Sequence, residues 1–538
     1  MAAGLRRLGR HTTALLAAAV ATGAVASLVQ TQVNLAALSR LGAAVTPGLR
    51  AWTTLQDLAG FGPVMVGIAL AALLPAMLAA HALDHVTRPA WRAPLFVAAA
   101  IAGLWAAFWL MLNVIPMPAI AATRGPLDHA LMAMSGIAGG LVYARMTSPA
   151  RQPTGPRRQV LVAALLALAP AALFLITSPC AADRLEAVDP ASYRVQVVAT
   201  GLERPWSLAF LPDGRMLVTE MAGRLLAVAA DGARTPIATD GLPPVFQRGG
   251  TIGLMDVALD PDFERNSLLY LTLGHGQEGA NGTRLVRARL AGNRLEDVRV
   301  LFSSTPKPRV GNNGGRIAFL PDGTLALTVG DGNWQREEAQ NVANHLGSVV
   351  RLDRDGKAPA DNPFLGRPGA APELYSLGHR NPQGIAVDPA GGELLLTEHG
   401  ARGGDEINRI VAGKNYGWPL VTAGIDYPFG RVTPFSRLAG FEAPLLEWTP
   451  SIAPGGLAVY DGALFPDWRG DLLVPALRGR AIHRVLRDGG KIVGQQTLLA
   501  ELGVRMRDVK VGPDGAVYVL TDGPKASLLR VTPAPMRQ

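Results

Sequence analysis

The chain has 538 residues, more than one ordinary hydrophobic core can hold, so at least two domains are expected. The net charge of +9 is confined to the first third: residues 1–185 contain 13 basic and 4 acidic side chains, and the remainder contains 38 of each. Because the basic excess stands between apolar segments, it argues against a nucleic-acid-binding protein, and we expect no nucleic-acid partner.

Five apolar stretches in the first 180 residues are long enough, or nearly long enough, to cross a bilayer. They lie at about 12–30, 60–83, 94–115, 128–144 and 159–178. The fourth is short and rich in glycine. This pattern predicts an α-helical transmembrane region of about five spans over residues 1–185.

The arginines between these stretches predict the orientation of the region in the membrane. With the N-terminus inside, the inner segments carry nine arginines and the outer segments four, as the positive-inside rule requires. A cleavable signal peptide is the alternative interpretation of the first stretch, because Arg6, Arg7 and Arg10 precede it. Five spans would export the rest of the chain. We therefore expect a multi-pass protein of a bacterial-type inner (plasma) membrane with its C-terminal domain in the periplasm.

Polar side chains stand near the ends of two of the apolar stretches. His81, Asp84 and His85 end the second, and Asp128 and His129 begin the fourth. Such groups commonly mark the membrane interface. The sharper hypothesis is a site at which a lipid quinone collects electrons.

From Tyr193 onward the pattern changes to short strands separated by turns, and one turn-plus-strand unit recurs. Its six copies are LPDGRMLVTE from Leu211, DPDFERNSLLYLTLG from Asp260, LPDGTLALTVGDG from Leu320, DPAGGELLLTEHG from Asp388, FPDWRGDLLVPAL from Phe465 and GPDGAVYVLTD from Gly512. Six copies of one unit predict an all-β six-bladed β-propeller over residues 186–538. We expect residues 193–198 to complete the last blade and close the ring.

Two motifs between the strands carry residues suited to chemistry. In GHRNPQG, residues 378–384, a proline follows Arg380 and Asn381, so these two side chains should stand at a strand end. In EHGARGGDEIN, residues 398–408, carboxylates stand beside glycines that let backbone carbonyls approach a cation. Hard oxygen ligands of this kind suit Ca²⁺. The alternative for either motif alone is a polar loop with an internal ion pair.

Together with GKNYGWP, residues 413–419, these motifs resemble the pyrroloquinoline quinone (PQQ)-dependent sugar dehydrogenases of the glucose/sorbosone and aldose dehydrogenase family. The resemblance covers roughly residues 193–531 and none of the membrane region. It implies a six-bladed propeller, PQQ and Ca²⁺ as cofactors, and oxidation of an aldose or related aldehyde. Electrons would pass to a lipid quinone or another acceptor.

The resemblance also implies cofactor-binding residues. Arg505 and Arg507, in GVRMRDVKVGPDG, match the family's paired arginines, and two-residue spacing on a strand turns both toward one side. The family's cofactor lysine falls at Arg478. Arg380 and Asn381 match the residues that hold the quinone oxygens, and Arg380 would stabilise negative charge on the reduced quinone.

The metal is expected, by the same resemblance, at the backbone carbonyls of Gly400 and Ala401, where Ala401 stands in place of the family's usual proline. Asp405 and Glu406 are nearby acids. Three roles are open for them: ligands of this ion, ligands of a second ion, or groups that only order the loop.

The main departure from the family is at its general base, a histidine four residues before the arginine of a GGR-like string. That position is Asn312, in NNGGR, and an amide cannot accept a proton at neutral pH. The acid that orients the base in the family is retained as Asp331 and could act directly or through water. His345 and His399 are other candidate bases. Thr251 stands where the family often has a cofactor-contacting glutamine.

Three functions are therefore compared. The first is a membrane-anchored quinoprotein dehydrogenase. The second is a catalytically silent propeller that binds PQQ or a carbohydrate, for which Asn312 is the main argument. The third is a Ca²⁺-dependent propeller lactonase, which would keep the metal and would have no use for Arg505 and Arg507.

Overall fold

The computed structural model describes residues 2–114, 120–148, 185–249, 251–427 and 429–535. The chain divides into two compact units. The helical unit comprises residues 1–183 with 425–434, and the β unit comprises residues 184–424 with 435–538. Each unit is described in turn.

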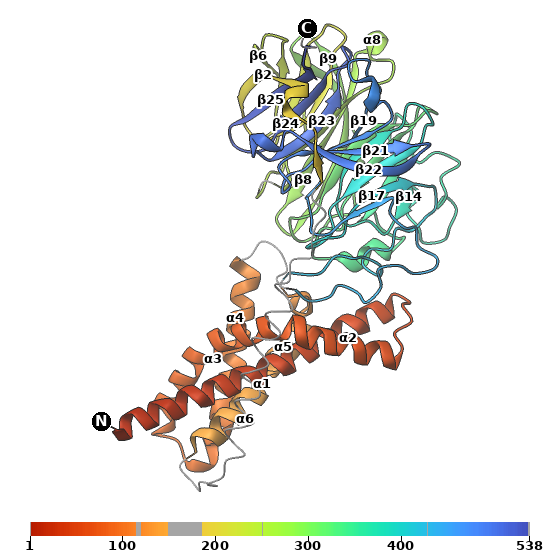
Figure 1. Cartoon of the computed structure of the whole chain (residues 1–538). Coiled ribbons are helices and arrows are strands. Elements are labelled where there is room, and N and C mark those ends of the chain that lie inside the picture. The colour runs from red at the N-terminus through yellow and green to blue at the C-terminus, as the bar shows by residue number, and fades with distance from the viewer. Residues whose placement is uncertain (1, 115–119, 149–184, 250, 428, 536–538) are drawn as a thin grey trace. The chain divides into compact units, whose positions relative to one another are not determined.

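The described part of the helical unit is built mainly from four helices that pack side by side, α1 against α3 and α6, and α4 against α3 and α6 (Figure 1). Its elements are α1 (Ala2–Arg40), α2 (Pro47–Gly60), α3 (Gly62–Asp84), η1 (Pro89–Trp91), α4 (Arg92–Val114), η2 (Ala121–Thr123), α5 (Pro126–Met134) and α6 (Gly136–Thr147). Small residues allow close packing: at Gly140 a side-chain Cβ would lie 2.5 Å from the Cα of Val97 on α4.

Three described helices are long and apolar enough to cross a membrane, at residues 8–40, 62–84 and 89–114. They correspond to the first three predicted spans. The fourth prediction was wrong as a single span, because the helix is interrupted at Ser135 and forms α5 and α6. The fifth predicted span, 159–178, lies outside the described residues.

The polar residues near the predicted spans do not form one group. His81 contacts the rings of His11 and His85, at centroid distances of 5.0 and 5.5 Å, and Asp84 pairs with Arg92. His129 is buried elsewhere, against Trp105 and Phe108, with ring centroids 4.5 and 5.9 Å away. The two clusters lie at opposite ends of α4, since one includes its first residue and the other its later turns.

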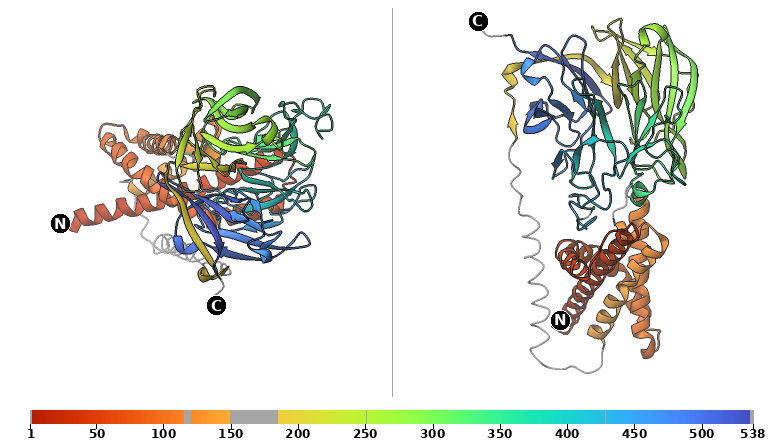
Figure 2. Two further views of the ribbon diagram at one scale, coloured as in Figure 1. Left: turned by 90° about the horizontal axis from the view of Figure 1, so that it is seen from above. Right: turned by 90° about the vertical axis from the view of Figure 1, so that its right-hand side faces the viewer.

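The β unit is a propeller of six sheets, five with four strands and one with five, and Figure 2 shows it from two further directions. Blade 1 is β3 (Pro205–Phe210), β4 (Met216–Glu220), β5 (Arg224–Val228) and β6 (Arg234–Ile237); blade 2 is β7 (Leu254–Leu259), β8 (Leu268–Gln277), β9 (Ala280–Ala291) and β10 (Arg294–Ser303); blade 3 is β11 (Gly314–Phe319), β12 (Leu325–Val329), β13 (Ser348–Leu352) and β14 (Leu374–Leu377). Blade 4 is β15 (Pro382–Val387), β16 (Leu394–Glu398), β17 (Asp405–Ile410) and β18 (Leu446–Trp448); blade 5 is β19 (Ala458–Val459), β20 (Leu472–Pro475), β21 (Ile482–Asp488) and β22 (Lys491–Leu498); blade 6 is β23 (Met506–Val511), β24 (Val517–Thr521) and β25 (Ala526–Pro533) with β2 (Tyr193–Leu202). The short elements between strands are η3 (Pro190–Ser192), α8 (Phe263–Asn266), η4 (Arg336–Gln340), η5 (Pro466–Trp468) and η6 (Ala500–Leu502).

The ring closes as the sequence predicted. Strand β2, which precedes blade 1 in the sequence, pairs antiparallel with β25, the last described strand of the chain, and so completes blade 6 (Figure 1). A further strand, β1 (Glu186–Ala187), adds to blade 5 by pairing parallel with β22. Every pair of neighbouring blades shares one cluster of buried apolar side chains. A sheet buried on both faces needs a neighbour on each side, and closure supplies it.

Threonines in the recurring unit connect one blade to the next. The hydroxyls of Thr219, Thr272 and Thr397 donate to backbone carbonyls of the following blade, at Met255 (2.5 Å), Gly315 (2.6 Å) and Gly455 (3.1 Å). These threonines are fully buried, and each bond satisfies a polar group that burial would otherwise leave unpaired.

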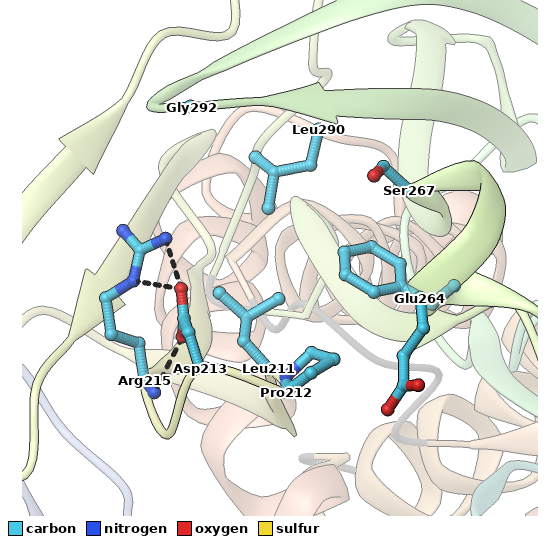
Figure 3. Close-up of a pocket in the computed structure, with 9 residues that line it drawn as sticks. Leu211, Pro212, Asp213, Arg215, Glu264, Ser267, Leu290 and Gly292 are labelled. Atoms are coloured by element: carbon cyan, nitrogen blue, oxygen red, sulfur yellow. Dashed lines mark hydrogen bonds and ion pairs between the residues drawn. The ribbon is translucent and has the colours of Figure 1, made fainter.

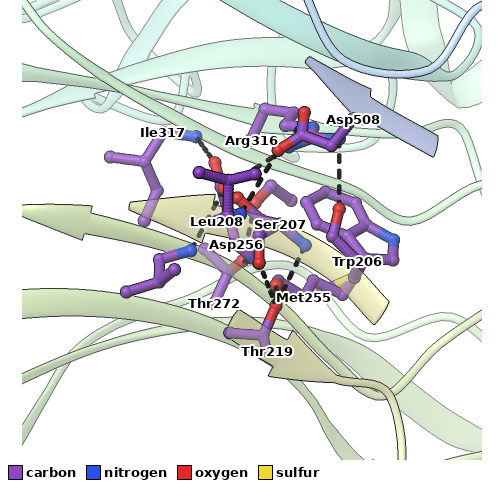
Figure 4. Close-up of polar contacts among 12 residues, drawn as sticks. Trp206, Ser207, Leu208, Thr219, Met255, Asp256, Thr272, Arg316, Ile317 and Asp508 are labelled. Atoms are coloured by element: carbon purple, nitrogen blue, oxygen red, sulfur yellow. Dashed lines mark hydrogen bonds and ion pairs between the residues drawn. The ribbon is translucent and has the colours of Figure 1, made fainter. Parts of the chain in front are cut away.

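A charged network joins the inner strands near the centre of the propeller (Figure 4). The guanidinium of Arg316 lies 2.9 Å from Asp508 and 3.5 Å from Asp256, and it stacks on Trp206 with 4.0 Å to the ring centroid. Asp256 also accepts bonds from the Ser207 hydroxyl and the backbone N–H of Ile317. The residues of this network come from blades 1, 2, 3 and 6, so it holds the ring together across its centre.

Buried histidines make the stability of the propeller sensitive to acid. His483, on β21, is buried beside Trp448, and burial lowers its pKa to about 4 from an ordinary 6.5. Since the unfolded chain binds the proton first, stability should fall as the pH drops from 6.5 to 4, by up to about 1.4 kcal/mol per pH unit. Thermal unfolding across this range should show a shallower fall for His483→Leu than for the wild type. An unchanged slope would contradict the prediction.

Candidate functional site

The antiparallel order of the blades brings the candidate residues to one face of the propeller. The first strand of a blade begins at the same edge at which its second strand ends. Three candidate residues lie just before the first strand of a blade: Asn312, Arg380 and Arg505. Two others lie just after the end of a second strand: Asp331 and His399. Positions that are far apart in the sequence are therefore gathered around one end of the central axis.

A buried carboxylate, Glu398, accepts hydrogen bonds that fix the loop carrying Arg380. Glu398, at the end of β16, accepts bonds from the backbone N–H of Arg380 (2.6 Å) and from Asn408 (3.0 Å). It also lies 2.8 Å from Nδ1 of His379, whose ring stacks on Tyr416. These contacts hold the Arg380–Asn381 backbone at a defined position.

The guanidinium of Arg380 is buried and makes no ion pair with a described carboxylate, although its charge lowers the pKa of the nearby Asp331. It donates to the carbonyl of His399 (3.3 Å) and to Asn333 (3.4 Å), and it lies over Trp418 at 5.4 Å. Among the residues that the structure describes, no carboxylate lies within ion-pair distance of it. Burying a cation in this way is costly unless an anion completes the site, so the position fits a negatively charged ligand.

Arg505 and Arg507 share one carboxylate. Asp522 accepts from Nε of Arg505 (2.7 Å) and from two nitrogens of Arg507 (3.0 and 3.2 Å). Arg507 is buried and Arg505 is half exposed, with 47% of its side chain accessible. One negative charge for two guanidinium groups leaves a positive excess, which suits a further anion. The paired arginines lie together as predicted, at the end of blade 6.

The other predicted cofactor residues are placed differently. Arg478 is exposed in the turn after β20, next to Leu477, whose carbonyl accepts a bond from Arg505 at 3.4 Å. It lies near Arg505 at the rim and contributes to no described ion pair. Asn381 is buried and accepts a bond from Gln383 (3.1 Å). The Thr251 carbonyl accepts from Asn313.

The amide of Asn312, which the resemblance predicts to stand at the position of the family's base, is bonded to Asp331. Its Nδ2 donates to Asp331 Oδ1 at 2.8 Å, and Trp418 Nε1 donates to Oδ2 at 2.7 Å. The backbone N–H of Asn333 donates to Oδ1 as well. Burial raises the pKa of Asp331. The carboxylate is fully buried and accepts hydrogen bonds from three donors. Asp331 therefore positions other groups and is not exposed to a substrate in this structure.

The two histidines named as candidate bases have different surroundings. His345 lies 3.0 Å from the Thr305 hydroxyl and 3.3 Å from Glu373, and it packs on Phe302, away from Arg380. His399 lies beside Arg380, and its Nε2 donates to the carbonyl of Pro454 at 2.7 Å. Burial and the nearby arginines lower the pKa of His399.

The two acids of the metal motif cannot hold one ion together. Asp405 accepts from the backbone N–H of Gly400 (2.8 Å), the Ser451 hydroxyl (2.7 Å) and the N–H of Ala453 (2.8 Å), so it orders the loop. Glu406, the next residue on β17, points to the opposite face, into a pocket of about 290 Å³ shared with Tyr416 and Glu447. Burial and Glu398 raise the pKa of Glu406.

The backbone around Gly400 is compact enough to require glycine. A Cβ on Gly400 would lie 2.0 Å from the carbonyl oxygen of Gly403, and Gly403 and Gly404 have positive φ angles of 146° and 67°. Within the described ranges, no three acidic, histidine or cysteine side chains are arranged to hold a metal. The carbonyls of Gly400 and Ala401 remain the ligands that the family resemblance predicts.

Three residues near the site were not found from the sequence. Lys307 is buried beside Asn313, His275 stands at the end of β8, and Trp418 caps Asp331. Trp418 lies in the GKNYGWP motif, which gave a signal. For Lys307, the sequence shows only that it is the first lysine in the chain, and this does not indicate a functional role.

A separate pocket of about 310 Å³ opens at the opposite edge of blades 1 and 2 (Figure 3). It is lined by the β3–β4 turn, with Leu211 and the Arg215–Asp213 pair, and by Phe263 and Leu290 of blade 2. First strands end at this edge, so the pocket is remote from Arg380. Its lining includes one ion pair and several apolar side chains, so this pocket is not a candidate for the catalytic site.

A closed six-bladed propeller with cationic side chains gathered at one end of its axis defines the class of protein as a β-propeller with a candidate anion-binding site. The chain belongs to the Glucose / Sorbosone dehydrogenase family, whose sequence profile matches residues 202–530. Residues 1–183 of the helical unit lie outside that match.

Individual relatives agree with this assignment. The chain is 40% identical over 369 residues to the aldose sugar dehydrogenase YliI of Escherichia coli K12, covering 67% of this chain and 98% of the relative. The crystal structure of the soluble E. coli aldose sugar dehydrogenase in its apo form matches with 39% identity and a TM-score of 0.61, covering 64% of this chain and all of that chain. The PQQ-bound aldose sugar dehydrogenase of Streptomyces coelicolor matches with 29% identity and a TM-score of 0.52, covering 64% and 99% of the two chains.

Proposed function

We propose that this protein is a membrane-anchored quinoprotein that oxidises an aldose sugar or a related aldehyde, with PQQ and Ca²⁺ as cofactors. The single observation that carries the proposal is the buried guanidinium of Arg380, which makes no ion pair among the described residues and immediately precedes the first strand of blade 4. Family membership supports the same reaction class.

The residues present fit PQQ, a planar tricarboxylate. Arg507 and Arg505 offer cations with only Asp522 to balance them, and Arg380 and Asn381 would hold the quinone edge. Arg478, at the rim, would supply a further cation. When bound, the cofactor supplies an acceptor for a hydride. The protein's part is to orient the substrate, to hold the developing charge at Arg380, and to accept a proton.

Ca²⁺ would be held by the backbone carbonyls of Gly400 and Ala401, since carbonyl oxygens are ligands that this ion accepts. Asp405 would keep the loop in shape, since its oxygens already accept three bonds. Glu406 would take no part in this site, because it points to the other face of β17.

The three apolar helices support anchoring in a membrane. We propose that the anchor is multi-pass in a bacterial-type inner membrane, with the propeller in the periplasm. A lipid quinone is the proposed electron acceptor, with another carrier as the alternative.

Asn312 favours a second candidate function, a propeller that binds PQQ or a carbohydrate without turnover. The amide stands where the family has its base, and loss of a general base typically costs about 10² to 10⁴ in rate. A Ca²⁺-dependent lactonase fits less well, because it would have no use for the unbalanced guanidinium groups of Arg380 and Arg507.

One experiment separates these functions. Membranes containing the full chain would be incubated with PQQ and Ca²⁺, and a panel of aldoses would be offered with an artificial dye as electron acceptor. We expect dye reduction that requires both additions. PQQ binding without dye reduction would instead establish the silent propeller, and lactone hydrolysis that does not depend on PQQ would establish the lactonase.

A further inference from the structure

The replacement of the family's base by Asn312 leaves open which group accepts the substrate's proton. Asn312 cannot, and both oxygens of the Asp331 carboxylate already accept hydrogen bonds. A replacement must lie close to these two residues and must be able to hold a proton reversibly near neutral pH.

Lys307 lies at this position, and its side chain is enclosed. Its Nζ donates to the side-chain oxygen of Asn313, the neighbour of Asn312, and only 3% of the residue is exposed. A Cβ on Gly332, the residue after Asp331, would lie 2.6 Å from Cδ of Lys307. The lysine therefore runs between the two segments that the Asn312–Asp331 bond joins.

The backbone holds Lys307 in place from the neighbouring blade. Its N–H and carbonyl both bond to the backbone of Asn281 on β9, at 2.8 and 3.0 Å. The Asn281 side chain donates to the same carbonyl at 3.1 Å. Asn313 is held in turn, because its Nδ2 donates to the Thr251 carbonyl at 2.8 Å. The amine is thus fixed by blades 2 and 3 together.

The surroundings of Lys307 favour a neutral amine more than those of an exposed lysine do. Burial lowers its pKa to about 8, while the charge of Asp331 acts in the opposite direction. The other titratable groups facing this region are His275, at the end of β8, and Arg284, on β9. Burial and the cations Arg284 and Lys307 lower the pKa of His275 to about 4, so the imidazole is neutral.

We propose that the amine of Lys307 accepts the proton of the substrate's C1 hydroxyl, taking the role that Asn312 cannot perform. This rests on the proposed function. The O–H bond breaks and its proton joins the neutral amine to give an ammonium group. The C1–O bond becomes a carbonyl as a hydride, carrying the electron pair of the C1–H bond, leaves for an ortho-quinone acceptor. The ammonium then returns its proton to solvent.

His399 is the rival group, and the structure distinguishes the two. Its Nε2 carries the hydrogen donated to Pro454, and it lies on the Arg380 side of the site, not beside the vacated base. A histidine acting as base would impose a pH profile centred well below 8, because its pKa is lowered from 6.5.

The test uses the full chain in membranes with PQQ and Ca²⁺ and compares K307M with K491M, which removes an exposed lysine at the start of β22. For K307M we expect kcat to fall by about 10² to 10⁴ with PQQ affinity unchanged. The wild-type and K491M rates should rise with pH through a midpoint near 8, and this limb should be absent in K307M. N312H should restore turnover to K307M, with a midpoint near the histidine value of about 6.5.

A second readout does not depend on activity. The chain has six lysines, so ¹³C-lysine NMR of the wild-type apoprotein can follow each one against pH. We expect one lysine, absent from the K307M spectrum, to titrate near pH 8 and the others near 10. Titration of Lys307 with the others would overturn the proposal, as would a K307M profile equal to that of the wild type. Failure of the wild type itself to oxidise any sugar would overturn the proposed function and, with it, this role.

Discussion

Arg380→Met should reduce kcat for aldose oxidation by about 10² to 10³ and should weaken PQQ binding, while leaving the fold intact. Arg380 is buried and bonds only to neutral acceptors, His399 and Asn333, at 3.3 and 3.4 Å. Removing it breaks no direct ion pair, although it takes away a nearby cation that lowers the pKa of the buried Asp331, so the change in the free energy of unfolding should be on the order of 1 kcal/mol. Dye-linked rates, PQQ titration and thermal unfolding of the same preparation measure the three quantities.

Arg409→Met is the matched control for this result. Arg409 is on β17 of the same blade and pairs with Glu393 at 3.1 Å on the exposed surface. It should affect neither rate nor PQQ affinity. If Arg380→Met kept wild-type turnover and PQQ affinity, the proposal that this guanidinium meets the cofactor would be wrong. If it failed to fold, Arg380 would have a structural role instead.

Arg316→Met should destabilise the propeller by about 3 to 5 kcal/mol. It removes the cation between Asp256 and Asp508, both of which are buried, and leaves two carboxylates without a charge partner. The loss of stacking on Trp206 adds to this effect. Equilibrium unfolding of the full chain in denaturant, followed by tryptophan fluorescence, would measure the shift.

Two comparisons make this result specific. Arg530→Met breaks an exposed pair with Asp514 on the last blade and should cost less than about 1 kcal/mol. The double variant D508N/R316M removes one charge of each sign and should recover part of the loss. A stability for Arg316→Met within 1 kcal/mol of the wild type would show that the central network does not hold the blades together.

Much of the fold could be predicted because it is written in local patterns. The recurring turn and strand around Leu211, Leu320 and Gly512 each form a blade hairpin, and a sheet with two apolar faces needs neighbours on both sides. The same reasoning placed residues 193–198 on the last blade, and β2 does pair with β25. The first three apolar stretches likewise became helices, because length and composition alone decide that property.

The fourth stretch shows where local reasoning failed. Its composition is apolar enough for a span, but Ser135 and the glycines after it divide it into two short helices. Those glycines pack against other helices, Gly139 against Thr22 and Gly140 against Val97, and such contacts are long-range. Similarly, Asp405 and Glu406 were grouped because they are adjacent, yet neighbours on a strand point to opposite faces.

The sequence by itself determined the number of blades, the apolar character of the first third, the family, and the identity of the residue at the vacated base position, since each depends on neighbouring residues or on a repeated motif. Only the tertiary structure decided which charges have partners. It left Arg380 without a carboxylate, gave Arg505 and Arg507 one between them, and placed Lys307 against the loop of Asn312 and Asp331. Charge balance and burial depend on distances between residues far apart in the chain, and no local pattern encodes them.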